Sequence, residues 1–204
     1  MPRSATRTRE RILDAAYRLF RRRGYSRVTM DDIAAEARLT KRTLYHHFES
    51  KDQLLAEVLA AQDQLAVAAF KTFGDRLSGS PDAIVKGMFR ELAVWADRPR
   101  WAGSGFTRLV IELADLPGHP ARLIARRHKA RLERCFCELL EQSGVRRAAG
   151  LARAIWLLSE GAVSLILVHG DQGYSLAASE AAMTLLSAHL HSYPLVGRRA
   201  GVKS

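Results

Sequence analysis

Cysteine is scarce in this chain of 204 residues, which has only Cys135 and Cys137. The two lie two positions apart on a predicted helix, so their side chains point to nearly opposite sides and cannot easily join. The sequence therefore lacks a disulfide framework, which suits a protein of the reducing cytosol.

Long apolar runs are missing as well. The most apolar stretch, residues 154–168, is too short to span a bilayer and contains Glu160. The first twenty residues lack the uninterrupted apolar core and the small-residue cleavage site of a signal peptide. We therefore expect a soluble, cytoplasmic protein that has no membrane partner.

Sequence motifs for catalysis are also absent. The chain has no nucleophile elbow, no P-loop and no glycine pattern for dinucleotides. None of its seven histidines has a spacing to Cys or Asp that suits a metal, and His189 and His191 are too close in sequence to share a helix face. We expect no enzyme activity, no metal and no cofactor.

Positive charge, by contrast, is abundant and unevenly distributed. The net charge is +11, and residues 1–51 hold 13 Lys and Arg against 6 Asp and Glu, while residues 52–204 hold 19 against 15. This excess favours a polyanionic partner for the first quarter of the chain, either nucleic acid or an anionic membrane surface. Charge alone fits an ordinary solvated basic surface equally well.

Helical periodicity runs along almost the whole chain, and no convincing alternating strand appears. The fold class is therefore predicted to be all-α with about nine helices, and 48% hydrophobic residues suffice for a core. Breaks are predicted at 38–40, 74–81, 98–105, 116–120, 142–147 and 170–174. We predict a helix-turn-helix domain over residues 1–50 and a helical ligand-sensing and dimerisation domain over residues 51–204.

The predicted second and third helices have the form of a helix-turn-helix. Thr29 can cap the second helix with Asp32 as its capping-box partner, and Thr40 can cap the third, over residues 41–48. In the third helix one side is apolar, and the other carries side chains that can bond base edges or phosphates: Arg42, Thr43, Tyr45 and His46. Wheel geometry alone would also fit an ordinary surface helix.

The amino-acid sequence of this segment distinguishes a DNA-binding helix from an ordinary surface helix. Residues 24–34 (GYSRVTMDDIA), Ala37, and residues 40–51 (TKRTLYHHFESK) closely resemble the head of the TetR/AcrR family of bacterial transcriptional regulators, with a match over about residues 8–55. The resemblance implies roles for two groups of positions. Those expected to hold operator phosphates are Thr29, Tyr45, His47 and Lys51, and those expected to face the groove are Thr40, Lys41, Arg42, Thr43 and His46.

One position departs from the family pattern. The family usually has glycine where this chain has Arg38, in the turn before the third helix. Glycine adopts a left-handed backbone at no steric cost, whereas arginine would pay about 1 kcal/mol. We expect a phosphate contact of Arg38 to compensate for this.

Beyond the head the resemblance is one of architecture. It implies a homodimer through the last two helices, at about 147–169 and 175–191, and palindromic half-sites need two heads. The apolar run 154–168 fits such an interface, although it would also fit a central core helix.

The resemblance also implies a pocket for a small-molecule effector among the middle helices. Polar groups on apolar walls are what such a pocket needs. The candidates are Phe89, Trp95, Trp101, Phe106, His128, Arg153, Trp156, Glu160 and Ser164. Single buried polar residues and aromatics are more often structural, and that alternative stays open.

The function predicted from the sequence is therefore a repressor that leaves its operator when an effector binds. Two alternatives keep DNA as a partner: a dimer switched by cysteine oxidation, and a protein that binds DNA without sequence preference. A basic protein of the membrane surface is a further alternative to the DNA-binding readings.

Overall fold

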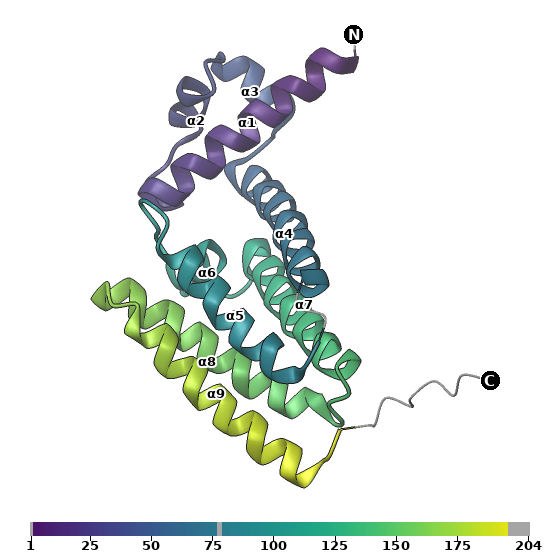
Figure 1. The fold of residues 1–204 in the computed structure, drawn as a ribbon. Coiled ribbons are helices and arrows are strands. Elements are labelled where there is room, and N and C mark those ends of the chain that lie inside the picture. The colour runs from purple at the N-terminus through teal and green to yellow at the C-terminus, as the bar shows by residue number, and fades with distance from the viewer. Residues whose placement is uncertain (1, 77–78, 196–204) are drawn as a thin grey trace, which may run out of the picture. The chain divides into compact units, whose positions relative to one another are not determined.

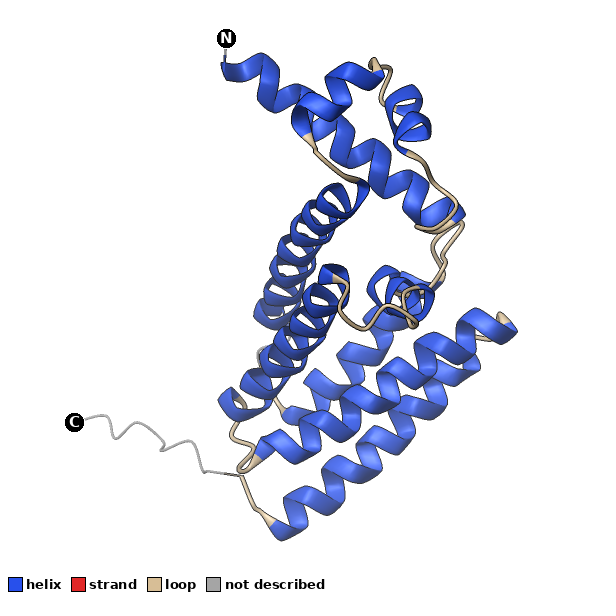
Figure 2. Cartoon of the chain, turned by 180° about the vertical axis from the view of Figure 1, so that it is seen from behind, coloured by secondary structure: helices blue, strands red, loops and turns tan. Residues whose placement is uncertain are grey.

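The computed structural model describes residues 2–76 and 79–195, and the regular structure of these residues is helical throughout (Figures 1 and 2). The predicted fold class is confirmed. The helices of the described residues are α1 (Pro2–Arg23), α2 (Met30–Glu36), α3 (Lys41–His47), α4 (Lys51–Arg76), α5 (Pro81–Ala96), α6 (Gly105–Glu112), α7 (Pro120–Gln142), α8 (Ala148–His169) and α9 (Gly173–Ser192).

The predicted loop at 74–81 is wrong at its start. Helix α4 continues through Gly74 to Arg76. A Cβ at Gly74 would lie 2.6 Å from Cδ2 of Leu139 on α7. Glycine here permits a close approach of two helices and does not end one.

The chain forms two compact units. Unit 1 consists of the described residues up to Ala66 together with 104–128, and unit 2 consists of 67–103 together with the described residues from 129 onward. Helices α4 and α7 therefore contribute residues to both units. The division into functional domains at residue 50 stays a prediction.

Unit 1 contains two apolar clusters. The first joins α1, α2, α3 and the start of α4 around residues with almost no exposed surface: Ile12, Ala15, Ala16, Leu19, Val28, Ile33, Leu44, Phe48 and Leu54. The second includes Tyr25, Leu59, Phe106, Leu109 and Ala125. The first cluster fixes α1, α2 and α3 against one another.

Unit 2 is built on long helices. Helices α8 and α9 pack along each other, and α5 packs along α9 (Figures 1 and 2). Their core includes Phe89, Phe136, Leu140, Ile155 and Leu186. Small side chains at Ala148, Ala152 and Ala182 let the helices approach closely.

Helix α8 is more apolar than α5, α7 and α9, the other helices that contribute to this core. It is long and apolar enough to cross a membrane, but the core helix of a soluble protein can have the same length and composition. Only 33% of its most apolar window is buried within the chain. The remainder leaves large apolar side chains such as Leu157 exposed.

Candidate nucleic-acid interface

Helix α2 begins with the predicted capping box. The Thr29 hydroxyl accepts a hydrogen bond from the Asp32 amide at 3.1 Å, and the Asp32 carboxylate accepts one from the Thr29 amide at 2.9 Å. The bond from the Thr29 amide holds the pKa of Asp32 below its ordinary value. Ile33 is fully buried on the inner face, so Thr29 stands at the exposed start of the helix.

Helix α2 ends in a left-handed turn at Arg38, whose φ is 54°. The Leu39 amide donates to the Ala34 carbonyl at 2.9 Å and the Arg38 amide donates to the Ala35 carbonyl at 3.0 Å, which is a Schellman motif. Arginine therefore keeps the backbone conformation that glycine adopts without strain, at a cost of about 1–2 kcal/mol.

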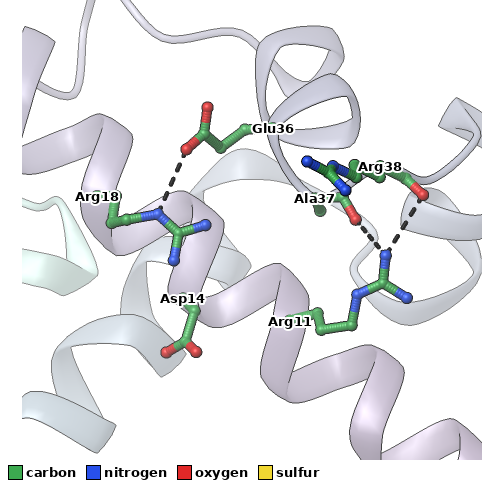
Figure 3. A pocket seen from close by; sticks show the side chains of 6 residues that line it. All are labelled: Arg11, Asp14, Arg18, Glu36, Ala37 and Arg38. Carbon is green, nitrogen blue, oxygen red and sulfur yellow. Dashed lines mark hydrogen bonds and ion pairs between the residues drawn. The ribbon is translucent and has the colours of Figure 1, made fainter.

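A guanidinium from α1 supports this turn (Figure 3). Nη2 of Arg11 donates to the Ala37 carbonyl at 2.6 Å and to the Arg38 carbonyl at 3.4 Å. These atoms border a surface hollow of about 350 Å³ lined by Arg11, Asp14, Arg18, Glu36, Ala37 and Arg38. The Arg38 side chain is itself exposed.

Helix α3 begins and ends close to the predicted positions. The Thr40 hydroxyl accepts a hydrogen bond from the Thr43 amide at 3.1 Å, and the hydroxyls of the two residues are 2.8 Å apart. Leu44 and the C-cap Phe48 have no exposed surface. The apolar side of α3 is thereby fixed in the core of unit 1.

The opposite side of α3 is polar and exposed. Tyr45 has 44% of its surface exposed, which is high for an aromatic residue. Arg42 and His46 are exposed beside it, and the His46 and His47 rings meet edge to face with centroids 5.6 Å apart. Nζ of Lys41 lies 2.9 Å from the Asp31 carboxylate. This side can therefore offer hydrogen-bond donors and positive charge to a groove.

Lys51, at the start of α4, has partners within the chain. Its ammonium donates to the Tyr25 carbonyl at 3.2 Å and to the Val28 carbonyl at 3.0 Å, and it lies 4.2 Å from the centre of the Tyr25 ring. An ammonium has three donors, so one remains for a phosphate. Lys51 thus ties α4 to the segment before α2.

Tyr25 is the centre of this connection, a role that its residue type and position in the sequence do not indicate. Its hydroxyl donates to the Asp52 carboxylate, and the ring packs edge to face on His119 with centroids 5.8 Å apart. Burial, followed by the Asp52 hydrogen bond, raises the pKa of Tyr25. The same hydrogen bond lowers the pKa of Asp52.

Glu112, the last residue of α6, completes the connection. Its carboxylate accepts hydrogen bonds from the Tyr25 amide at 2.9 Å and the Ser26 amide at 2.6 Å. Burial tends to raise the pKa of Glu112, but the hydrogen bonds from Ser26 and Tyr25, together with the positive charge of Arg108, lower it below its ordinary value. No local sequence signal links residues that are 86 and 87 positions apart.

The predicted effector residues fall into both units. In unit 1, Phe106 stacks on the His128 ring at a centroid distance of 3.7 Å, and Nδ1 of His128 lies 2.8 Å from the Asp63 carboxylate. His128 is thus a buried, paired histidine. Its role towards a ligand stays a prediction.

The other candidates belong to unit 2. Phe89 is buried in the core, Trp95 meets Trp101 edge to face, and Trp156 packs near Phe70. The half-buried side chain of Glu160 lies 2.6 Å from Nζ of Lys129, Arg153 pairs with Glu133 at 2.9 Å, and Ser164 is exposed. The described residues contain no group of three or more His, Cys, Asp or Glu placed to hold a metal.

Comparison with known proteins places this geometry in a family. A model of the bacterial regulatory proteins of the tetR family matches residues 12–58, which include the second half of α1, all of α2 and α3, and the start of α4. A crystal structure of a putative TetR transcriptional regulator from Streptomyces avermitilis is 30% identical, with 89% of this chain and 97% of that chain covered and a TM-score of 0.76. The chain belongs to the TetR family.

A second TetR-family structure agrees over nearly the whole chain. The regulator SCO4454 from Streptomyces coelicolor is 27% identical over 92% of this chain and 96% of its own, with a TM-score of 0.76. The predicted family is confirmed, and with it the helical fold behind the TetR head.

Two curated relatives match over a short stretch of the chain. SrpR of Pseudomonas putida is 43% identical over 58 residues, and the probable acrEF/envCD operon repressor of Escherichia coli is 38% identical over 61 residues. These matches cover 27% and 28% of the two relatives, so the chain matches less than a third of their length.

Proposed function

We propose that this TetR-family protein is a cytoplasmic transcriptional repressor that binds a palindromic operator as a homodimer and is released by a small-molecule effector. The observation that supports the proposal is the two-sided character of α3. One side is polar and exposed, and the other is anchored in the core by Leu44 and Phe48. A recognition helix needs this division, because one side must enter the major groove while the other stays in the core.

The residues proposed to contact DNA have two roles. Base edges would be read from α3 and its cap by Thr40, Lys41, Arg42, Thr43 and His46. Phosphates would be held by Thr29, Arg38, Tyr45, His47 and Lys51, and such contacts fix register without reading sequence. Removing the Arg38 phosphate contact should weaken binding to every sequence and reduce the salt slope by about 1.

An exposed apolar face on α8 and α9 supports the proposed homodimer. Leu157 and Val168 each have 73% of their surface exposed, and Leu176 on α9 has 65%. Leu157, Gly161, Ser164 and Val168 recur at three- and four-residue intervals and so share one side of α8. Two copies could bury this side against each other under two-fold symmetry.

Dimerisation can be tested by placing a charge on that side. Leu157→Glu should convert a dimer into a monomer in sedimentation experiments, because the carboxylate would be buried without a partner. Ile111→Glu is the matched control, since Ile111 is exposed to 69% on α6, outside the proposed interface. Dimers that persist with Leu157→Glu would place the interface elsewhere.

The effector would act by favouring one conformation of the dimer over another. The residues proposed to line an effector site are Phe89, Trp95, Trp156 and Glu160 in unit 2 and, separately, Phe106 and His128 in unit 1, whereas Ser164 belongs to the exposed side of α8 proposed for the dimer. A difference in effector affinity of about 1–3 kcal/mol between the two states would change operator binding by about 5–150-fold.

The first experiment selects binding sites from random duplex DNA and compares the selected site with scrambled DNA over a range of salt concentrations. A palindrome that is preferred by at least ~10³ supports the operator proposal. Binding with a steep salt slope but without a preferred sequence would replace it with non-specific binding to phosphates.

A further inference from the structure

The turn before the recognition helix requires support that its own sequence does not supply. Arg38 keeps the left-handed conformation at a φ of 54°, where arginine lacks the freedom of glycine. The Schellman bonds satisfy the carbonyls of Ala34 and Ala35. The carbonyls of Ala37 and Arg38, within the turn itself, point towards α1 (Figure 3).

Arg11 meets both of these carbonyls with one nitrogen. The distances are 2.6 Å to Ala37 and 3.4 Å to Arg38. Carbonyls at the C-terminal end of a helix carry partial negative charge and attract a cation. A charged donor also forms a stronger hydrogen bond than a neutral one.

Arg18 gives the contrast within the same hollow. It lies seven residues further along α1 and is aligned with Arg11, but its Nε donates to the Glu36 carboxylate at 3.3 Å. That ion pair joins an exposed arginine to a half-buried glutamate side chain, whereas the Arg11 bonds restrain the backbone of the turn. The two arginines therefore have the same charge and different structural targets.

We infer that Arg11 is a positioning residue for DNA recognition: it holds the left-handed turn at Arg38 and thereby fixes where α3 begins. This inference rests on the proposed operator-binding function of α3. Arg11 compensates, by a contact within the same chain, for the residue that replaces glycine. Its effect on DNA binding passes through the turn and does not involve a phosphate.

A double-mutant cycle in the full chain tests this inference. Arg11→Ala should lower affinity for the selected operator by about 10-fold, the loss of one charged hydrogen bond, with the salt slope unchanged. In an Arg38→Gly background the same change should cost about 3-fold or less, because glycine needs no support in this conformation. Arg11→Lys should recover part of the loss, since it keeps the charge and loses the planar fork.

A second measurement needs no DNA. Hydrogen exchange of the Leu39 amide reports the Schellman bond directly. Arg11→Ala should speed this exchange by about 10-fold, and Arg18→Ala should leave it within about 2-fold, as expected for an exposed ion pair.

Three results would overturn the inference. The first is a salt slope reduced by about 0.9 in Arg11→Ala, which would make Arg11 a phosphate contact. The others are equal losses from Arg11→Ala with and without the Arg38→Gly change, or equal effects of Arg11→Ala and Arg18→Ala. Failure of the proposed operator-binding function would give a different result from failure of the inference about Arg11. The unaltered chain would then prefer no DNA sequence, and Leu39 exchange would still decide whether Arg11 holds the turn.

Discussion

The two compact units differ in what holds their helices together. In unit 1, charged side chains bind backbone groups of distant segments: Lys51 to the carbonyls of Tyr25 and Val28, Glu112 to two amides, and Arg11 to the turn after α2. In unit 2, the long helices rely on apolar side chains such as Phe136 and Ile155.

Helix length explains much of this difference. Helices α2 and α3 have seven residues each and offer few buried positions, whereas α8 has 22 residues and buries eight. Hydrophobic contacts are not directional, but a charged hydrogen bond fixes a distance and an angle. The charged hydrogen bonds of unit 1 therefore define the relative positions of its segments, whereas the hydrophobic contacts of unit 2 tolerate repacking.

Truncation of a buried aromatic residue should have the largest effect, and it should be similar in both units. Phe48 in unit 1 and Phe136 in unit 2 have no exposed surface, so Phe48→Ala and Phe136→Ala should each cost about 3–5 kcal/mol in urea unfolding. The three tryptophans, Trp95, Trp101 and Trp156, all lie in unit 2. A tryptophan fluorescence midpoint that stays unchanged in Phe48→Ala would mean that the units unfold independently.

Removal of a polar interaction should reveal the difference between the two units more clearly than truncation of an aromatic residue. Glu112→Gln keeps one acceptor oxygen but loses the charge, and it should lower the free energy of unfolding by about 1–2 kcal/mol. The matched change in unit 2 is Ser175→Ala, which removes a hydrogen bond of 2.9 Å to the Phe89 carbonyl and should cost under about 1 kcal/mol. A larger loss from Ser175→Ala in chemical denaturation would reverse the comparison.

Acid should weaken unit 1 through the same groups. The pKa values of Asp52 and Glu112 are lowered in the folded chain, so their contribution to stability is present above their ordinary values near 4 and is lost as the pH falls through the folded values. Because Glu112 is partly exposed, its share should be under about 1 kcal/mol. Urea midpoints at pH 7 and pH 3 should differ less in Glu112→Gln than in the unaltered chain, and an equal difference would contradict this assignment.

The cysteines of unit 2 should have the smallest effect. Burial raises the pKa of both Cys135 and Cys137, and neighbouring glutamates raise it further. Less thiolate means slower oxidation. Mild peroxide should therefore leave operator affinity unchanged within about 2-fold, and a peroxide effect that Cys137→Ser abolishes would favour the redox alternative.

Local sequence signals predicted most of the fold. The caps at Thr29 and Thr40 are visible as residue types at fixed spacing, and α7 has the predicted bounds because Pro120 and Gly144 mark its ends. Gly74 shows the limit of such signals. The same residue type ends a helix or admits a neighbouring side chain, and only the approach of Leu139 distinguishes the two.

The candidate DNA site also has a part that local sequence signals predict and a part that they do not. The exposed side of α3 follows from its helical period, but the supports at Arg11 and Glu112 are contacts over 26 and 86 or more positions. A single sequence carries no information about such pairs. The arginine at position 38 left the conformation of the turn open, and the structure shows that the left-handed turn is kept. Its compensation by a phosphate stays a proposal beside the Arg11 contact that the structure contains.

The division of α4 and α7 between the units has a consequence for recombination. The chain passes from one unit to the other three times, after Ala66, Gly103 and His128. A chimera that exchanges only residues 1–50 between TetR relatives would combine the Tyr25 segment of one protein with the residue at position 112 of the other, and it would keep this hydrogen bond only where that residue can accept it. The segments that encode unit 1 are therefore discontinuous in the gene, and a chimera that exchanges the residues up to Ala66 together with 104–128 would take both partners of these contacts from one parent.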